Sequence, residues 1–196
     1  MTGLNKVAVI DTGAGNLFSL FACLKRIGFE AELIRSAKAI ADQNFRALII
    51  PGQGRFGAVM QQLNRNGLAD VIKAWFEDEM PIIGICVGMQ IFFESSEEDK
   101  NVAGLALLDG QVSKLNSPKQ PMVGWCSLNA NDATLNDRDV YFVNSYAAKG
   151  SEYATSWAEY GEKFVASIST KGLDAFQFHP EKSGVQGEEI LKLCLK

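Results

Sequence analysis

The chain has 196 residues, of which 47% are hydrophobic and 21% are charged, and its formal net charge is −4 at pH 7. This is the composition of an ordinary globular protein, and the length fits a single domain over residues 1–196. The acidic balance argues against a protein that binds nucleic acid or an anionic membrane, so small molecules or proteins are the expected partners. No segment reaches the roughly 18 apolar residues of a membrane span, and no secretory pattern opens the chain, which predicts a cytoplasmic protein.

The first half of the chain alternates between strand and helix patterns. Gly28 is the predicted end of the first helix, and Asn16 is its predicted N-cap. Such alternation indicates a parallel sheet with helices on both sides. Strands are expected at 6–11, 29–35, 47–50 and 81–85, and helices at 17–27, 36–42, 58–64, 68–79 and 87–94.

The second half has a different pattern, in which apolar residues recur with a period of two. This period predicts antiparallel strands laid against the first half. They are expected at 107–115, 140–146, 153–160, 164–169 and 175–178. The acidic run Glu94 to Lys100 is expected to be a solvated helix end and loop, and residues 187–196 a terminal helix. The predicted fold is therefore α/β, with a mainly parallel central sheet flanked by helices and an additional antiparallel sheet portion.

The four cysteines lack the paired spacing of a zinc site or a disulfide framework, and no metal or cofactor is expected. Cys23 and Cys194 lie on apolar faces of predicted helices, where a cysteine is usually a small buried hydrophobe. Cys86 is different, because it stands between Gly84 and Gly88 where a predicted strand meets a predicted helix. The sequence Gly-Ile-Cys-Val-Gly is typical of a nucleophile elbow, in which flanking glycines leave room for a substrate carbonyl and the helix N-terminus favours a thiolate.

The only histidine of the chain is His179, so it is the one candidate for a conventional general base to Cys86. Glu181 follows two residues later, across Pro180, where its carboxylate could orient the imidazole. These residue types predict acyl transfer by a Cys-His-Glu triad. The glycine-rich loop 51–56 is expected at the same edge of the sheet, where one of its backbone N–H groups and that of Val87 would form an oxyanion hole.

These motifs resemble the class I (triad) glutamine amidotransferases. The resemblance rests on the segments Gly84 to Gln90 and Phe178 to Ser183, and within the family it is greatest to the glutaminase subunits of imidazole glycerol phosphate synthases. Supporting segments lie at 11–16, 51–56, 121–125 and 141–146. The resemblance implies that glutamine is hydrolysed to glutamate and ammonia through a thioester on Cys86. His179 would act as base and then as acid, and Glu181 would orient it.

The resemblance also implies a substrate site and a partner. Gly52 and Val87 would form the oxyanion hole, and Gln90 with the backbone of Ser145 and Tyr146 would hold the amino-acid end of glutamine. Ammonia would pass to a (β/α)8 barrel cyclase in a heterodimer, to make imidazole glycerol phosphate and AICAR in histidine biosynthesis. No cofactor is implied. The docking surface near the tunnel mouth would include Asn16, Trp125, Tyr141 and Lys182.

Four positions depart from the family pattern. Asn144 replaces a usual histidine, Cys126 a usual asparagine, Gln53 a small apolar residue and Val87 a leucine. Val87 contributes only its backbone N–H, whereas the other three lie in segments expected to face the partner or the glutamine site. The departures leave open a paralogous glutaminase that feeds ammonia to a barrel partner in cell-surface sugar amidination or amination. A binding module without turnover and a free-standing cysteine hydrolase are further alternatives. The family's activation by its partner predicts that residues 51–54 act as a switch.

Overall fold

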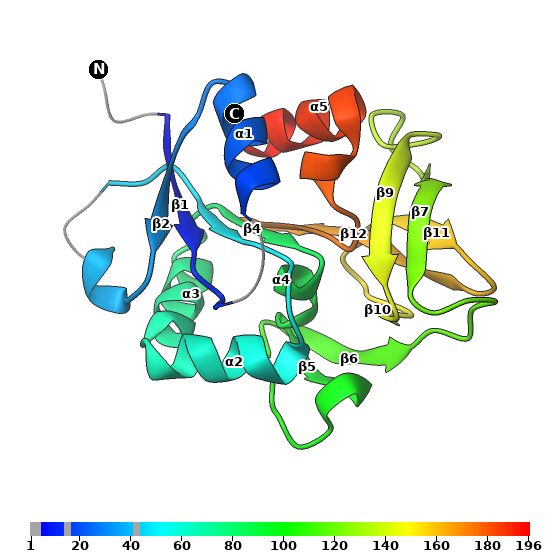
Figure 1. The fold of residues 1–196 in the computed structure, drawn as a ribbon, viewed down its shortest axis with the longest axis horizontal. Helices are drawn as coiled ribbons and strands as arrows, with labels where there is room; N and C mark the ends of the chain where they lie inside the picture. The colour runs from blue at the N-terminus through cyan, green and yellow to red at the C-terminus, as the bar shows by residue number, and fades with distance from the viewer. Residues whose placement is uncertain (1–4, 14–16, 41–43) are drawn as a thin grey trace.

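The computed structural model describes residues 5–13, 17–40 and 44–196. Its centre is an eight-stranded sheet with the order β2-β1-β3-β4-β13-β12-β11-β8 (Figure 1). The first five of these strands run parallel, and the last three are antiparallel to their neighbours. The bounds are β1 (Lys6–Ile10), β2 (Glu30–Ile34), β3 (Leu48–Ile50), β4 (Ile82–Ile85), β13 (Leu173–Phe176), β12 (Lys163–Thr170), β11 (Ala154–Glu159) and β8 (Asn129–Ala130).

Helices cover both faces of this sheet (Figure 1). On one side lie α1 (Phe18–Arg26) and α5 (Gly184–Cys194), and on the other lie α2 (Phe56–Arg65), α3 (Leu68–Glu77) and the short α4 (Val87–Gln90). Helix α1 ends as expected before Gly28, whose φ of +95° favours glycine. The predicted N-cap Asn16 lies outside the described residues. Within the part of the chain that the structure describes, no helix is long and apolar enough to cross a membrane.

Two smaller sheets complete the fold. One has the order β10-β6-β5, and the other is a ribbon of β7 paired with β9. These strands are β5 (Phe93–Ser96), β6 (Leu108–Lys114), β7 (Met122–Ser127), β9 (Asp139–Asn144) and β10 (Tyr146–Ala148). Three short 3-10 helices are η1 (Ala37–Ala39), η2 (Glu97–Asp99) and η3 (Pro180–Lys182). The α/β fold class, with its mainly parallel central sheet and antiparallel additions, is confirmed.

The core joins the two halves of the chain. Strand β3 and residues 7–10 of β1 are fully buried because helices cover both faces, which explains their uninterrupted apolar sequences. On the other side of the molecule, the Phe142 ring of β9 packs edge-to-face against Phe164 and Phe178, with centroids 5.5 and 5.8 Å apart. This aromatic contact fixes β9 against β12 and against the segment that leads to His179.

Several local expectations are wrong. The helix predicted over 87–94 ends at Gln90, and the chain then enters β5. Phe92 and Phe93 are fully buried there, and the carbonyl of Phe92 accepts the N–H of Leu107, so cross-chain hydrogen bonds replace helical ones. Strand β7 is not among the predicted strands, and β13, expected to be antiparallel, pairs in parallel with β4.

The acidic run at 94–100 is partly exposed, as expected, but it forms the end of β5 and η2 and not a helix end and loop. The Glu94 carboxylate accepts the N–H of Gly110 at 2.8 Å, and the Glu97 carboxylate accepts that of Lys114 at 2.7 Å. Asp99 accepts the N–H of Gly57 in the first turn of α2 at 2.9 Å. These carboxylates accept hydrogen bonds from backbone donors of β6 and of the first turn of α2, so the run has a structural role.

Candidate active site

Cys86 lies at a sharp turn between β4 and α4. Its φ of 51° and ψ of −109° place a non-glycine residue in a strained region of backbone space. The turn is fixed from both sides, because the Cys86 N–H donates to the Phe176 carbonyl at 2.6 Å and the Cys86 carbonyl accepts the N–H of Gln90 at 3.1 Å. The sulfur is therefore presented at the carboxyl edge of the sheet, where the parallel strands end.

The neighbouring glycines are required by the protein's own chain. A Cβ at Gly88 would lie 2.1 Å from the Ile50 carbonyl oxygen, and one at Gly84 would lie 2.4 Å from the Phe92 ring. A Cβ at Gly52 would lie 2.5 Å from the Cys86 Cβ. The sequence pattern suggested that the flanking glycines leave room for a substrate carbonyl. The structure shows another reason for glycine at these positions, which is the close packing of three backbone segments around Cys86.

His179 lies just after β13, and its backbone is bonded to β9. Its N–H donates to the Tyr141 carbonyl at 2.8 Å, and its own carbonyl accepts the Ser183 hydroxyl at 2.7 Å. The Nδ1 atom lies 2.8 Å from the Glu181 Oε1 atom, and the two side chains are only 3% and 7% exposed. Glu181 sits on η3, not on a strand, because Pro180 opens a helical turn.

The ionisation of His179 follows from these contacts. Burial lowers the pKa of His179, but hydrogen bonds to Cys86 and to Glu181 outweigh burial and raise the pKa to about 10. The imidazole is therefore protonated at neutral pH, with Cys86 on one side and the Glu181 carboxylate on the other. Such an arrangement holds a proton ready for a leaving group.

The other three cysteines do not share this setting. Cys23 is fully buried, and burial is the main factor that raises the pKa of Cys23 to about 11. Burial likewise raises the pKa of Cys194, which is partly buried at the end of α5. The Cys126 sulfur contacts the Glu159 carbonyl of β11 at 3.6 Å. Cys23 and Cys194 are thus kept in their neutral thiol form.

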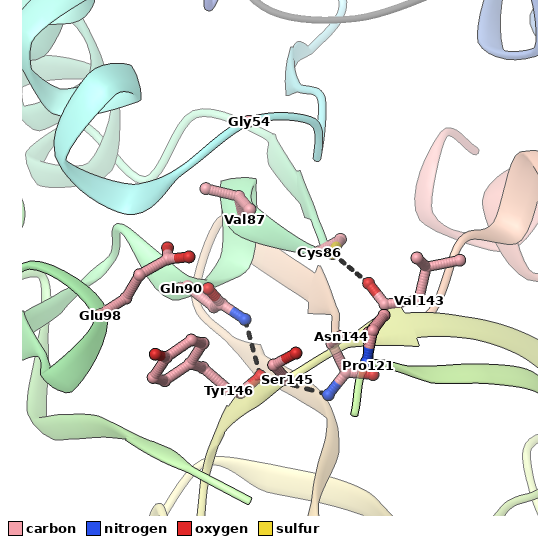
Figure 2. A pocket seen from close by; sticks show the side chains of 10 residues that line it. All are labelled: Gly54, Cys86, Val87, Gln90, Glu98, Pro121, Val143, Asn144, Ser145 and Tyr146. Atoms are coloured by element: carbon pink, nitrogen blue, oxygen red, sulfur yellow. Dashed lines mark hydrogen bonds between the residues drawn. The ribbon is translucent and has the colours of Figure 1, made fainter. Parts of the chain in front are cut away.

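A cavity of about 150 Å³ opens on one side of Cys86 (Figure 2). The three residues predicted to bind glutamine, Gln90, Ser145 and Tyr146, all line it. The Gln90 Nε2 atom donates to the Tyr146 carbonyl at 2.9 Å and to the Gln177 Oε1 atom at 3.0 Å. The Asn144 Nδ2 atom donates to the same Tyr146 carbonyl at 3.2 Å. The Tyr146 carbonyl is therefore already occupied, and within the Gln90 amide the Oε1 atom remains for a ligand.

A second cavity, of about 430 Å³, is also lined in part by Cys86. It is lined by Gly52, Val87, His179 and Lys182 together with Cys86 and the loop residues beside Gly52. The structure therefore brings together both predicted oxyanion-hole residues, the histidine and one predicted docking residue. The two cavities share Cys86 and Val87 among their lining residues, so both adjoin the cysteine.

Glu98 is a residue of the site that the sequence did not reveal. It lies in η2 and lines the smaller cavity beside Gln90 (Figure 2). Its Oε2 atom accepts the N–H of Phe56 at 2.9 Å, which also fixes the start of α2 after the glycine-rich loop. Nothing in its sequence context, an acidic run, distinguishes Glu98 from its neighbours.

The ribbon of β7 and β9 carries an exposed apolar face next to the site. Trp125 and Val123 are both 58% exposed, and their partners across the ribbon are Tyr141 and Val143. The rings of Trp125 and Tyr141 pack edge-to-face with centroids 5.8 Å apart. Val143 lines both cavities, so this face continues to the nucleophile. Asn144, in contrast, is only 5% exposed and belongs to the cavity wall.

The fold and this site are those of a class-I glutamine amidotransferase, and the chain belongs to that family. The family model described as glutamine amidotransferase class-I matches residues 8–196. The chain is thus an enzyme of this class. Among its relatives, an imidazole glycerol phosphate synthase subunit HisH from Thermus thermophilus is 38% identical over 192 residues, which cover 96% of each chain. A protein of the same name from Caldanaerobacter subterraneus is 41% identical over 195 residues and 95% of each chain.

A longer relative and a solved structure extend the comparison. The imidazole glycerol phosphate synthase hisHF of Arabidopsis thaliana is 37% identical over 96% of this chain, which spans 34% of that protein. A crystal structure of a glutamine amidotransferase superposes with a TM-score of 0.78 at 19% identity and covers 96% of this chain and 97% of its own. At that identity the likeness concerns the fold.

Proposed function

We propose that this chain is the glutaminase subunit of an imidazole glycerol phosphate synthase. It hydrolyses glutamine to glutamate and ammonia, and it passes the ammonia to a (β/α)8 barrel cyclase in histidine biosynthesis. The observation that carries the proposal is the meeting of Cys86 with the His179–Glu181 pair between two cavities. The names of its relatives support the pathway and the presence of a synthase partner.

The first half of the reaction forms a thioester. The Cys86 sulfur attacks the carboxamide carbon of glutamine, and the negative charge that develops on oxygen is stabilised by the backbone N–H groups of Gly52 and Val87. The protonated His179 gives its proton to the departing nitrogen, so ammonia leaves as the carbon–nitrogen bond breaks. Glu181 holds the other ring nitrogen at 2.8 Å and keeps the imidazole aimed at the reacting atoms.

The second half hydrolyses the thioester. His179, now neutral, takes a proton from water, and the resulting hydroxide attacks the acyl carbon. The carbon–sulfur bond breaks, glutamate leaves, and the pair of Cys86 and His179 returns to its starting state. Glutamine enters the smaller cavity with its ammonium group toward the Glu98 carboxylate, while the Gln90 Oε1 atom and the backbone of Ser145 and Tyr146 hold the rest of its amino-acid end.

The partner docks on the exposed ribbon. Trp125 and Tyr141 present the aromatic surface typical of an interface centre, and Lys182 lies at the larger cavity into which ammonia is released. Asn16 belongs to the proposed surface too, outside the described residues. The Tyr141 carbonyl accepts the His179 N–H, so a residue of the proposed docking surface is hydrogen-bonded directly to a residue of the triad. The loop 51–54, which lines both cavities, is the element that responds to the partner.

A paralogous glutaminase that serves a sugar-modifying barrel is the second candidate. This candidate rests on the three positions, Asn144, Cys126 and Gln53, at which the sequence departs from the family pattern. Asn144 is buried in the cavity wall and the Cys126 sulfur faces β11, so neither changes the exposed face of the ribbon. This placement favours the histidine-pathway partner. The protein is expected to act in the cytoplasm, where such biosynthesis takes place.

Glutamate release from glutamine tests the proposal. The chain is assayed alone and with a barrel synthase subunit, with and without an analogue of the cyclase substrate. Stimulation by barrel and analogue together supports the histidine-pathway assignment, whereas stimulation by the barrel alone points to the sugar-modifying paralogue. Cys86→Ala should abolish release and Cys194→Ala should not. No turnover in any mixture would favour a binding module, and hydrolysis of peptides by the chain alone would favour a cysteine hydrolase.

A further inference from the structure

Beneath the nucleophile lies a buried amide that the mechanism above does not use. Gln177 follows β13 directly and is fully buried, although it stands between two phenylalanines in an apolar run. Its Nε2 atom lies 3.6 Å from the Cys86 sulfur, within hydrogen-bond reach for a sulfur acceptor. A fully buried amide costs free energy unless its polar atoms are paired, so this contact requires a reason.

The surrounding hydrogen bonds decide which end of the Gln177 amide faces the sulfur. The Tyr146 carbonyl can only accept, so Gln90 must turn its NH2 group toward it, at 2.9 Å. The same NH2 group donates to the Gln177 Oε1 atom at 3.0 Å. The oxygen of Gln177 is thereby held by Gln90, and its NH2 group is left facing Cys86.

We propose that Gln177 is a further catalytic residue, which donates an amide N–H to the Cys86 sulfur and stabilises its thiolate, and that Gln90 is the positioning residue that holds this amide in place. In the thiol form the sulfur can donate its proton to the Val143 carbonyl, 3.7 Å away. Once ionised, the sulfur needs donors instead, and Gln177, which is fully buried and lines neither cavity, supplies one. A hydrogen bond to a charged acceptor is stronger than one to a neutral acceptor, so the contact favours the thiolate.

This inference rests on the proposed role of Cys86 as nucleophile, and its test does not depend on glutamine turnover. The rate of Cys86 alkylation by iodoacetamide is measured against pH on the full chain, and the Cys86 peptide is followed by mass spectrometry. Charged groups that face the sulfur or line its cavities are His179, Lys182 and Glu98, and all are kept. A chain without glutaminase activity would still report on the amide, so the two hypotheses fail separately.

Gln177→Met removes the donor at nearly constant volume. The pH of half-maximal alkylation should rise by about one unit, so alkylation at pH values well below the midpoint should slow about tenfold. Gln186→Met is the matched control, because Gln186 lies on α5 and lines neither cavity, and it should leave the profile unchanged. A folded Gln177→Met protein with the original profile would overturn the proposal.

Gln177→Glu provides the test if the Met variant does not fold. It keeps the shape of the side chain and the oxygen that accepts from Gln90, and replaces only the group that faces the sulfur. An ionised carboxylate there repels the thiolate, so the profile should move to higher pH by at least as much. An unchanged profile in this variant would equally contradict the proposal.

Discussion

The hydrogen bonds of His179 to Cys86 and to Glu181 should make the stability of this protein depend on pH in a defined window. In the unfolded chain the pKa of His179 returns to its ordinary value of 6.5, whereas in the folded protein it is raised to about 10. Between these values the folded protein holds a proton that the unfolded chain has lost. The contribution is therefore fully present below pH 6.5 and is lost as the pH rises through about 10, at up to about 1.4 kcal/mol per pH unit.

Glu181→Gln tests the part of this contribution that Glu181 supplies. The variant removes the charged acceptor 2.8 Å from Nδ1 in a buried site, so the free energy of unfolding should fall by about 3 kcal/mol at pH 6. The difference between the natural chain and the variant should shrink to less than about 1 kcal/mol at pH 10, where about half of the His179 side chains in the natural protein have already lost their proton. Titration of the cysteine thiols affects both unfolded chains equally and cancels in this difference.

The assay is urea unfolding followed by tryptophan fluorescence at pH 6, 8 and 10. Glu189→Gln is the matched control, because Glu189 pairs with Arg138 at the surface and its side chain is 55% exposed. That variant should change the free energy of unfolding by less than about 1 kcal/mol at every pH. A difference for Glu181→Gln that stays constant from pH 6 to pH 10 would refute the reasoning, since it would mean that His179 does not carry the extra proton.

The packing, the substrate site and the docking face each lead to one more prediction. Gly88→Ala places a Cβ 2.1 Å from a backbone oxygen and should lower the free energy of unfolding in urea by about 2–3 kcal/mol. Gly150→Ala, where a Cβ meets open space, should not lower it, and equal free energies of unfolding for the two variants would contradict the packing argument. Glu98→Gln should raise the KM for glutamine about tenfold, and the control variant Glu97→Gln should leave KM unchanged. An unaltered KM in Glu98→Gln would show that Glu98 does not bind the substrate. Trp125→Ala should weaken synthase binding about 30-fold by calorimetry while Tm stays the same, and unaltered affinity would place the interface elsewhere.

Much of the chemistry could be predicted from the sequence because its determinants are local. The elbow around Cys86 is a short strand-glycine-helix pattern, and His179 and Glu181 are two residues apart, so neither requires knowledge of distant contacts. The alternation of strand and helix in the first half is readable for the same reason, since a strand buried on both faces is uniformly apolar. The single histidine of the chain then leaves one partner for the cysteine.

The tertiary structure decided how these pieces meet. Strand β13 pairs in parallel with β4, which brings His179 and Gln177 to Cys86, and no periodic pattern specifies which strands become neighbours. The sequence does not reveal the role of the acidic run, Glu98 included, because exposed and backbone-capping carboxylates look alike in a sequence.

The sequence by itself determined which chemical groups this protein carries and their order along strands and turns. The structure alone decided their hydrogen-bond partners: that the amide of Gln177 turns its nitrogen to the sulfur, and that imidazole and carboxylate share a buried proton. Hydrogen bonds and burial depend on contacts between residues far apart in the chain. These contacts exist only once the chain has folded, and they set the ionisation of His179.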